Sequence, residues 1–211
     1  SKGDFKHNEK SLTLDKNDTI SIIHTNVKGI KSTLKDSLSL IKDEIIDIPE
    51  WIINWLREKF LAHAEYKNIS EKIYIDRSDS LFNHCQIINS DEVWEFLKNE
   101  GFTKIKSTEI TFKNQIGLFN SANTIVGAHG AGLTNMIFSK SNTSIIEFAP
   151  ENHPNNFFQR VSQINNLNYR KIVSKNLKLN NHNKRGDILV DLKILRESYE
   201  NLKEFKNKTI A

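Results

Sequence analysis

The sequence of 211 residues holds 30 Lys and Arg against 26 Asp and Glu, and its charged share of 27% is that of an ordinary globular protein. The single cysteine excludes an intramolecular disulfide framework and a cysteine-based zinc site, and no run approaches the roughly 18 apolar residues of a membrane span. A net charge of +4 on scattered lysines does not indicate a nucleic-acid binder. We therefore expect a cytoplasmic protein without a transmembrane segment, or one peripheral at the inner face of the membrane.

The first seventy residues predict a small N-terminal segment of one strand and two helices. The apolar run at 19–24 predicts a short strand, and apolar residues at helical spacing predict a helix over 32–46. A second helix is predicted over 49–64, because proline is favoured at the first helical position, where its missing N–H would be unpaired anyway. The expected buried stripe of this helix is Trp51, Ile52, Trp55, Leu56 and Phe60.

From residue 72 onward, strands and helices alternate about every twenty residues. Gly101 is typical of a helix stop and Thr111 of a helix cap. The alternation predicts an α/β fold: a Rossmann-like, mostly parallel sheet with helices on both faces. The expected strands lie at 73–75, 104–107, 124–127, 144–148 and 169–173, and the expected helices at 91–99, from 111, and at 130–138, 155–164 and 191–205.

The strongest functional signal follows the predicted strand at 124–127. Gly127, His129, Gly130 and Gly132 stand between the end of that strand and the next helix. In open α/β sheets, ligands bind at the carboxyl ends of the strands, and the N–H groups at a helix N-terminus favour phosphate. Glycine also lets the backbone approach an anion closely. The alternative interpretation is a tight strand-to-helix turn with an incidental histidine.

Two further side chains are expected at the same edge of the sheet. Arg77 follows the first of these strands, and its guanidinium is suited to a pyrophosphate; otherwise it is a surface arginine paired with Asp76 or Asp79. Glu147 stands at the end of the fourth strand, where its carboxylate would accept hydrogen bonds from both hydroxyls of a ribose. Otherwise Glu147 is a surface glutamate at a strand end.

These motifs follow one another along residues 49–173, and their order and spacing can be compared with those of a known family. The most specific part is His-Gly-Ala-Gly-Leu-Thr-Asn at 129–135 after a strand, with Tyr-x-x-Arg upstream at 74–77. Pro-Glu-Trp at 49–51, Ile-Ile-Asn at 87–89 and Ile-Glu at 146–147 add to it. In order and spacing, residues 49–173 resemble the C-terminal half of the glycosyltransferase 61 family.

The resemblance implies a GT-B-like fold and a hexosyl or pentosyl transferase. Such an enzyme moves a sugar from a nucleotide-sugar to a hydroxyl of a glycan or polysaccharide, with inversion at the anomeric carbon. The resemblance implies no cofactor and no metal, and the sequence has no Asp-x-Asp motif. Arg77 and His129 would then be catalytic, because the protein itself must stabilise the leaving diphosphate. The base is unassigned. The expected donor-binding residues are Arg77, His129, Gly130, Ala131, Gly132, Leu133, Asn135 and Glu147.

A GT-B enzyme has two lobes, so the resemblance predicts two unequal regions. Residues 71–211 would form the nucleotide-sugar-binding Rossmann-like domain, whereas 1–70 would be a remnant or edge of the acceptor lobe. Gln86 stands where the family usually has a basic residue. The expected partners are the nucleotide-sugar, the glycan acceptor and a second chain or missing N-terminal domain, with no nucleic acid.

Two other function classes stay open. A non-catalytic partner or truncated domain would keep the nucleotide-sugar-binding fold and expose an apolar face near Trp51 and Trp55, whereas an enzyme needs a deep cleft with an acceptor wall. An NAD-binding Rossmann protein is disfavoured, because Gly127, Gly130 and Gly132 do not have the G-x-G-x-x-G spacing.

Overall fold

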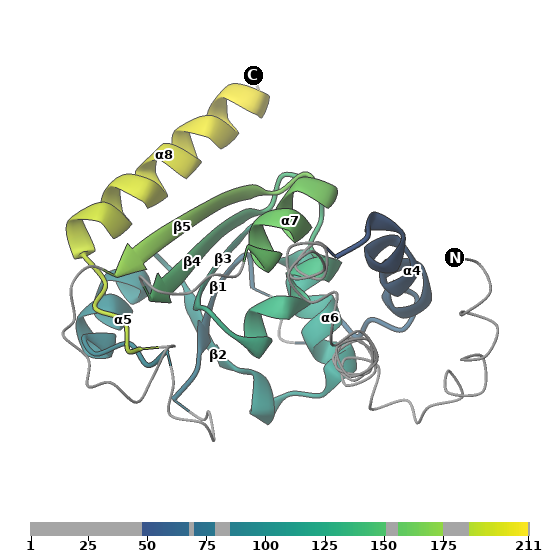
Figure 1. Cartoon of the computed structure of the whole chain (residues 1–211), viewed down its shortest axis with the longest axis horizontal. Coiled ribbons are helices and arrows are strands. Elements are labelled where there is room, and N and C mark those ends of the chain that lie inside the picture. Colours follow the sequence, from purple (N-terminus) through teal and green to yellow (C-terminus); the bar gives the residue numbers. More distant parts are fainter. Residues whose placement is uncertain (1–47, 68–69, 79–84, 151–155, 175–185, 211) are drawn as a thin grey trace, which may run out of the picture. The chain divides into compact units, whose positions relative to one another are not determined.

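A parallel β-sheet forms the centre of the structure (Figure 1). The computed structural model describes residues 48–67, 70–78, 85–150, 156–174 and 186–210. Within these ranges the sheet has five strands in the order β2-β1-β3-β4-β5, and every neighbouring pair is parallel. The strands are β1 (Lys72–Asp76), β2 (Thr103–Lys106), β3 (Thr124–Ala128), β4 (Ser144–Pro150) and β5 (Asn168–Ser174).

The strand order changes direction between β1 and β3. β2 pairs on one side of β1, whereas β3 and the strands after it pair on the other side. In open α/β sheets, ligands bind at such a topological switch point, outside the carboxyl ends of the strands. Because all the strands are parallel, the residues that follow β1 and β3 meet at this one edge of the sheet.

Helices connect the strands, precede β1 and follow β5. Their bounds are α4 (Glu50–Leu61), α5 (Ser90–Asn99), α6 (Phe112–Ser121), α7 (Phe157–Ile164) and α8 (Leu192–Ile210), together with the 3₁₀-helices η1 (Ser107–Glu109) and η2 (Ala131–Phe138).

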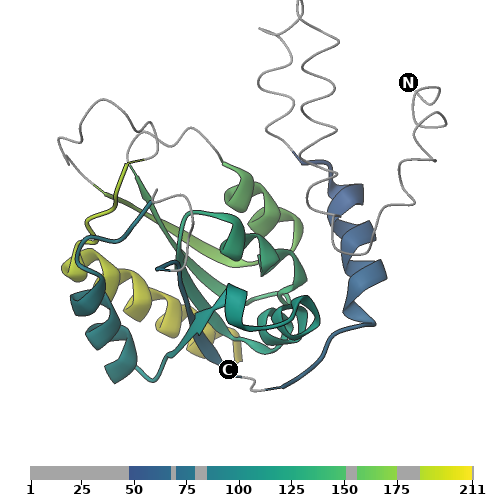
Figure 2. The same ribbon diagram turned by 90° about the horizontal axis from the view of Figure 1, so that it is seen from below.

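These helices cover both faces of the sheet (Figure 2). α5 and α8 lie on one face, while α6, α7 and η2 lie on the other, and α4 packs against η2, α6 and α7. The predicted α/β fold, with a Rossmann-like parallel sheet between two layers of helices, is confirmed.

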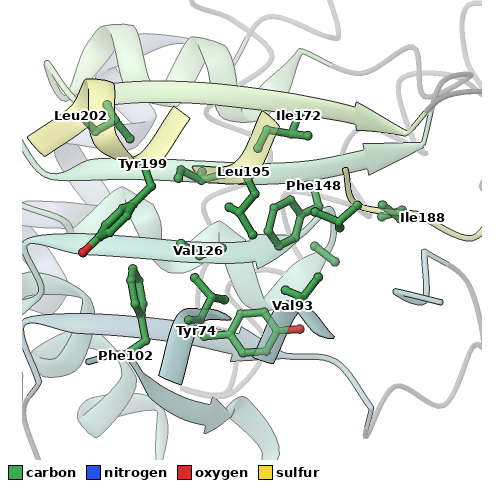
Figure 3. Packing of buried hydrophobic residues seen from close by; sticks show 14 of the residues in the cluster. Tyr74, Val93, Phe102, Val126, Phe148, Ile172, Ile188, Leu195, Tyr199 and Leu202 are labelled. Carbon is green, nitrogen blue, oxygen red and sulfur yellow. The ribbon is translucent and has the colours of Figure 1, made fainter. Parts of the chain in front are cut away.

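An apolar cluster fills the layer between the sheet and the helices α5 and α8 (Figure 3). Alternate residues of a strand point to the same face of a sheet. Tyr74, Val126 and Phe148 therefore lie together on this face, where Leu195 and Tyr199 of α8 pack against them. The three strands that carry them are buried on both faces, as is typical of a parallel sheet.

The alternate residues of the same strands point to the opposite face of the sheet. Ile75, Gly127 and Glu147 lie side by side there, because Ile75 pairs with Gly127 and Gly127 with Glu147 in the register. This is the face on which η2 packs. Glu147 is thus a charged residue in the middle of a buried strand.

Two predicted helix ends are confirmed. The Oγ1 of Thr111 accepts a hydrogen bond from the N–H of Asn114 at 3.3 Å and caps α6. Gly101 follows α5 with a φ of +80°, the left-handed conformation that glycine adopts most easily. The helix predicted over 130–138 is present, but as a 3₁₀-helix rather than an α-helix.

Two other predictions concern the N-terminal segment. Pro49 directly precedes α4 as its cap residue, one position earlier than predicted, and the helix ends at Leu61. The strand predicted at 19–24 and the helix predicted at 32–46 lie outside the described residues. Among the helices that the structure does describe, none combines the length and apolar composition needed to cross a membrane.

α4 buries only part of the predicted stripe. Leu56 is buried as predicted, whereas Trp51 is 55% and Trp55 40% exposed. The prediction followed the largest apolar side chains, and it was wrong for the two tryptophans and missed Ile53, which is fully buried. The buried side of α4 instead includes a partly buried arginine, Arg57, because this side faces the polar main-chain groups at the end of η2.

Candidate functional site

Arg77 and His129 lie at the switch point of the sheet, directly after β1 and β3. The Nη1 of Arg77 donates a hydrogen bond to the main-chain carbonyl of His129. The main-chain N–H of His129 donates to the carbonyl of Phe148 at 2.7 Å, which continues the pairing of β3 with β4. The guanidinium therefore lies across the turn from β3 into η2, and the fold brings together the two residues that the sequence predicted as catalytic.

Two glycines of this turn make room for β1 and for Arg77. Gly130 has a φ of +153°, and a β-carbon at this position would overlap the guanidinium of Arg77. A β-carbon at Gly132 would lie 3.1 Å from Cγ2 of Ile75 and 3.3 Å from Oγ of Ser107. These glycines are therefore required for the close approach of the turn to the neighbouring strand and to Arg77.

η2 begins at this turn. The first N–H groups of a helix have no carbonyl partner inside it. The N–H of Leu133 already donates to the carbonyl of Gly130 at 3.0 Å, and its side chain is fully buried. At the start of η2 this places the main-chain N–H groups of Ala131, which is exposed, and Gly132, which is half-buried, before the first hydrogen bond of the helix. Leu133, predicted as a donor-binding residue, is placed to hold η2 in the core.

The other end of η2 is held by side chains from two helices. The Nη1 of Arg57 donates to the carbonyls of Ile137 and Ser139, the latter at 2.8 Å. The amide of Asn120 donates to the carbonyl of Phe138 at 2.9 Å. Burial lowers the pKa of Arg57 from its ordinary value, yet an arginine remains a cation at any ordinary pH. A cation at the carboxyl end of η2 complements the helix dipole.

Glu147 lies beneath the turn rather than at its surface. It is 1% exposed, in the middle of β4. One carboxylate oxygen bonds Nδ1 of His129, and the other accepts from the hydroxyl of Tyr169. The expectation of an accessible strand-end carboxylate for ribose hydroxyls is therefore corrected: both oxygens are already engaged inside the protein, and Glu147 supports His129 from below.

Tyr169 is a site residue that the sequence did not reveal. It stands on β5, and burial, the charge of Glu147 and the hydrogen bond to Glu147 all raise the pKa of its hydroxyl. The phenol therefore remains a proton donor through the neutral pH range. A tyrosine near a strand start carries no signal by itself, and only the pairing of β4 with β5 brings it to Glu147.

Asn135 has a different place from the one predicted. Its amide is buried and donates to Oε1 of Gln115 at 2.6 Å. Gln115 in turn donates to the carbonyls of Ser107 and Ile110 at 2.8 and 3.2 Å. These bonds connect η2 to the segment after β2. The described contacts of Asn135 therefore fix the position of η2, and its side chain does not point to the turn at 129–132 in them.

Ser107 and Gln86 complete the described surroundings. The hydroxyl of Ser107 lies beside Gly132 and is buried without a hydrogen-bond partner. The amide of Gln86 lies 3.5 Å from the carbonyl of Arg77. In the part of the chain that the structure describes, no group of three or more His, Cys, Asp or Glu side chains is arranged to hold a metal ion.

Known proteins similar to this chain include sugar transferases. Residues 41–146, just over half of the chain, match the family model of glycosyltransferase 61. Beta-1,2-xylosyltransferase of Arabidopsis thaliana is 26% identical over 120 residues, which are 54% of this chain and 21% of that protein. The EGF domain-specific O-linked N-acetylglucosamine transferase of Drosophila melanogaster is 25% identical over 125 residues, 56% of this chain and 24% of that protein.

The N-terminal residues match a different family. Residues 1–74 match the model of monomeric isocitrate dehydrogenase. The NADP isocitrate dehydrogenase of Corynebacterium efficiens is 50% identical over 44 residues, which are 21% of this chain and 6% of that protein. The chain thus spans less than a quarter of the length of each of these three relatives. The transferase match contains the switch point with Arg77, His129 and the glycine turn, and by it the chain belongs to the glycosyltransferase 61 family.

Proposed function

We propose that this chain carries the donor-binding lobe of an inverting, GT-B type glycosyltransferase. It would take a hexosyl or pentosyl group from a nucleotide-sugar and transfer it to a hydroxyl of a glycan or polysaccharide. One observation carries the proposal: Arg77 and His129 meet at the carboxyl ends of β1 and β3, at the switch point of the sheet and beside the start of η2. Membership in the glycosyltransferase 61 family supports it.

The chemistry required of the site is stabilisation of a leaving diphosphate. An acceptor hydroxyl attacks the anomeric carbon, the bond from that carbon to the diphosphate oxygen breaks, and the diphosphate leaves with the electron pair. The guanidinium of Arg77 offers a planar fork of donors to two phosphate oxygens. The N–H groups of Ala131 and Gly132 and the ring of His129 add further donors. In this proposal these groups supply the positive charge without a metal or other cofactor, and the catalytic base is not assigned.

Nucleotide binding tests this proposal directly. We expect one of the UDP-, GDP- and CMP-sugars to raise the melting temperature of the purified chain, since ligand at 100 times its dissociation constant stabilises by about 2.7 kcal/mol. Arg77→Ala should weaken that binding by about 1.5–3 kcal/mol, the range for hydrogen bonds to charged groups. Arg77→Lys should lose less, because it keeps the charge but not the fork. A chain that none of these donors stabilises would reject the proposed function.

A second candidate, a non-catalytic partner, is favoured by one feature of α4. Trp51 and Trp55 are 55% and 40% exposed, and large exposed apolar side chains mark association surfaces when they lie together. A transfer assay run beside a light-scattering mass measurement separates the two candidates. We expect slow transfer by the 211-residue chain alone, because a GT-B enzyme closes two lobes around donor and acceptor. Rapid transfer by a monomer would reject the partner, whereas a dimer without transfer would favour it.

A further inference from the structure

A hydrogen-bonded chain of three polar side chains, two buried and one partly buried, lies beneath the proposed phosphate site. It runs from Tyr169 on β5 through Glu147 on β4 to His129 after β3. Glu147 is 1% exposed, and an isolated carboxylate at such a position would be very unfavourable. Each of its oxygens instead has a partner, the hydroxyl of Tyr169 or the ring of His129. Among the described contacts, this buried carboxyl group is thus connected to the proposed site through His129.

The orientation of the histidine follows from the chemistry of the carboxylate. An ionised carboxylate only accepts hydrogen bonds, so in the contact with an ionised Glu147 the donor is the Nδ1–H group of His129. The ring is further positioned by Phe158 of α7, whose ring centre lies 5.0 Å away. The second nitrogen, Nε2, lies on the side of the ring away from Glu147. A neutral ring would offer an acceptor there, and a protonated ring would offer a donor.

We propose that Glu147 and Tyr169 are positioning residues that keep the His129 ring oriented and protonated on both nitrogens when the diphosphate binds, so that Nε2–H donates to a phosphate oxygen. This inference rests on the proposed function. It changes the role of Glu147 from a contact with the donor to the internal counter-charge of the histidine. It also adds Tyr169, a residue outside the glycine turn, to the groups on which donor binding depends.

Cations near His129 oppose a positive charge on its ring, so a protonated ring requires a neighbouring anion. Among the described residues, the elements packed around the ring carry the cations Arg77, Arg160 and Lys171, the last of which is paired with Glu147 in the register. Like charges nearby oppose a cationic ring. Glu147 is the carboxylate in direct contact with the ring.

Tyr169 acts on the other oxygen of the carboxylate that contacts His129. A hydrogen bond to an ionised carboxylate favours the ionised form, so donation by Tyr169 supports Glu147 as the counter-charge in the proposal. The raised pKa of the Tyr169 hydroxyl means that this donor is present throughout the neutral range.

The first test measures UDP affinity at about pH 6 and about pH 8, on either side of the usual range of histidine titration. The variant His129→Gln supplies the baseline, because any pH dependence that remains there belongs to UDP and to other groups. We expect the affinity of the wild type for UDP to increase from about pH 8 to about pH 6 by more than that of His129→Gln does.

Glu147→Gln preserves the shape of the side chain and one acceptor but removes the charge. Its affinity for UDP should be about tenfold or more below that of wild type at the lower pH, and its affinity should change with pH as that of His129→Gln does. An unchanged affinity and pH profile in Glu147→Gln would overturn the proposal.

Tyr169→Phe tests the outer part of the chain. We expect it to weaken UDP binding several-fold at the lower pH while the protein stays folded. Tyr199→Phe is the matched control, because Tyr199 is buried on the opposite face of the sheet and its hydroxyl has no hydrogen-bond partner in the described structure. Equal affinities for Tyr169→Phe and wild type would exclude Tyr169 from the positioning role.

A ligand-free measurement separates this inference from the proposed function. Nitrogen-15 spectra of the histidine side chains, with His129 assigned by comparison with His129→Gln, report which ring nitrogen carries the proton. We expect the neutral form of His129 to carry it on Nδ1, and a neutral ring protonated on Nε2 would overturn the proposed orientation. If the Nδ1 signature is present but none of the UDP-, GDP- and CMP-sugars binds at either pH, the proposed function fails and the diphosphate contact fails with it.

Discussion

The guanidinium of Arg77 occupies the space that a β-carbon would need at Gly130. The two residues follow β1 and β3, which are neighbours in the sheet although α5, β2, η1 and α6 lie between them in the sequence. Their contact makes the two positions interdependent, because a side chain at residue 130 forces the arginine away from the turn. The absence of a side chain at position 130 is thus a packing requirement of the fold, whatever the turn binds.

Gly130→Ala should therefore behave like a loss of Arg77. We expect it to weaken UDP binding by about 1.5–3 kcal/mol, the value of a hydrogen bond to a charged group, and to destabilise the fold as well. Gly101→Ala is the control: Gly101 also has a positive φ, of +80°, but nothing lies within 4 Å of its added β-carbon. That variant should lose stability and keep its affinity. Isothermal titration and urea unfolding of both variants check this, and wild-type affinity in Gly130→Ala would contradict it.

Arg57→Met should destabilise the fold by about 1–3 kcal/mol, because it removes the donor that Arg57 supplies to the main-chain carbonyl of Ser139 at the end of η2. The carbonyl of Ile137 keeps a second donor, the amide of Asn165 at 2.7 Å. Methionine retains an apolar chain of similar length, so packing changes little. Arg170→Met on the exposed side of β5 is the control and should stay within about 0.5 kcal/mol of wild type. Urea unfolding at neutral pH measures both, and equal stabilities would show that the bonds from Arg57 to Ile137 and Ser139 contribute nothing.

Stability should fall in alkaline solution. Burial is the largest cause that raises the pKa values of Tyr74 and Tyr169 above the ordinary 10.0, and nearby carboxylates, Asp76 and Glu147, add to it. A folded-state pKa above the unfolded value means that the contribution is fully present below pH 10 and is lost as the pH rises beyond it. Unfolding free energies measured up to pH 11 should decline above about pH 10, and the decline should be smaller in Tyr169→Phe. The same decline in both proteins would contradict this prediction.

Tyr199→Phe should be neutral or slightly stabilising. The hydroxyl of Tyr199 is buried and, in the described structure, has no hydrogen-bond partner, so its removal ends a desolvation cost without breaking a bond. Tyr169→Phe should instead cost about 1–3 kcal/mol, because it leaves an oxygen of Glu147 buried without a donor. Thermal and urea unfolding of the two variants provide the comparison. A larger loss of unfolding free energy in Tyr199→Phe than in Tyr169→Phe would contradict this prediction.

The sequence predicted the elements well where local chemistry determines them. The cap at Thr111 and the stop at Gly101 depend on one or two residues and their immediate neighbours, and both are present as predicted. The two tryptophans of α4 were predicted wrongly as buried, because burial there depends on what η2 presents to the helix. Ile53 and Arg57 fit that surface, whereas the larger Trp51 remains in solvent.

The sequence by itself determined the alternation of strands and helices, and with it the edge of the sheet at which Arg77 and His129 would appear. Hydrophobic periodicity and the positions of glycines are local properties, so they can be identified in the sequence without knowledge of the fold. Only the tertiary structure decided how the strands are ordered and in what register they pair. That register buries Glu147 between His129 and Tyr169 instead of exposing it to a ribose. A side chain's partner across parallel strands depends on distant segments, and hydrogen bonding between those segments fixes it after the chain has folded.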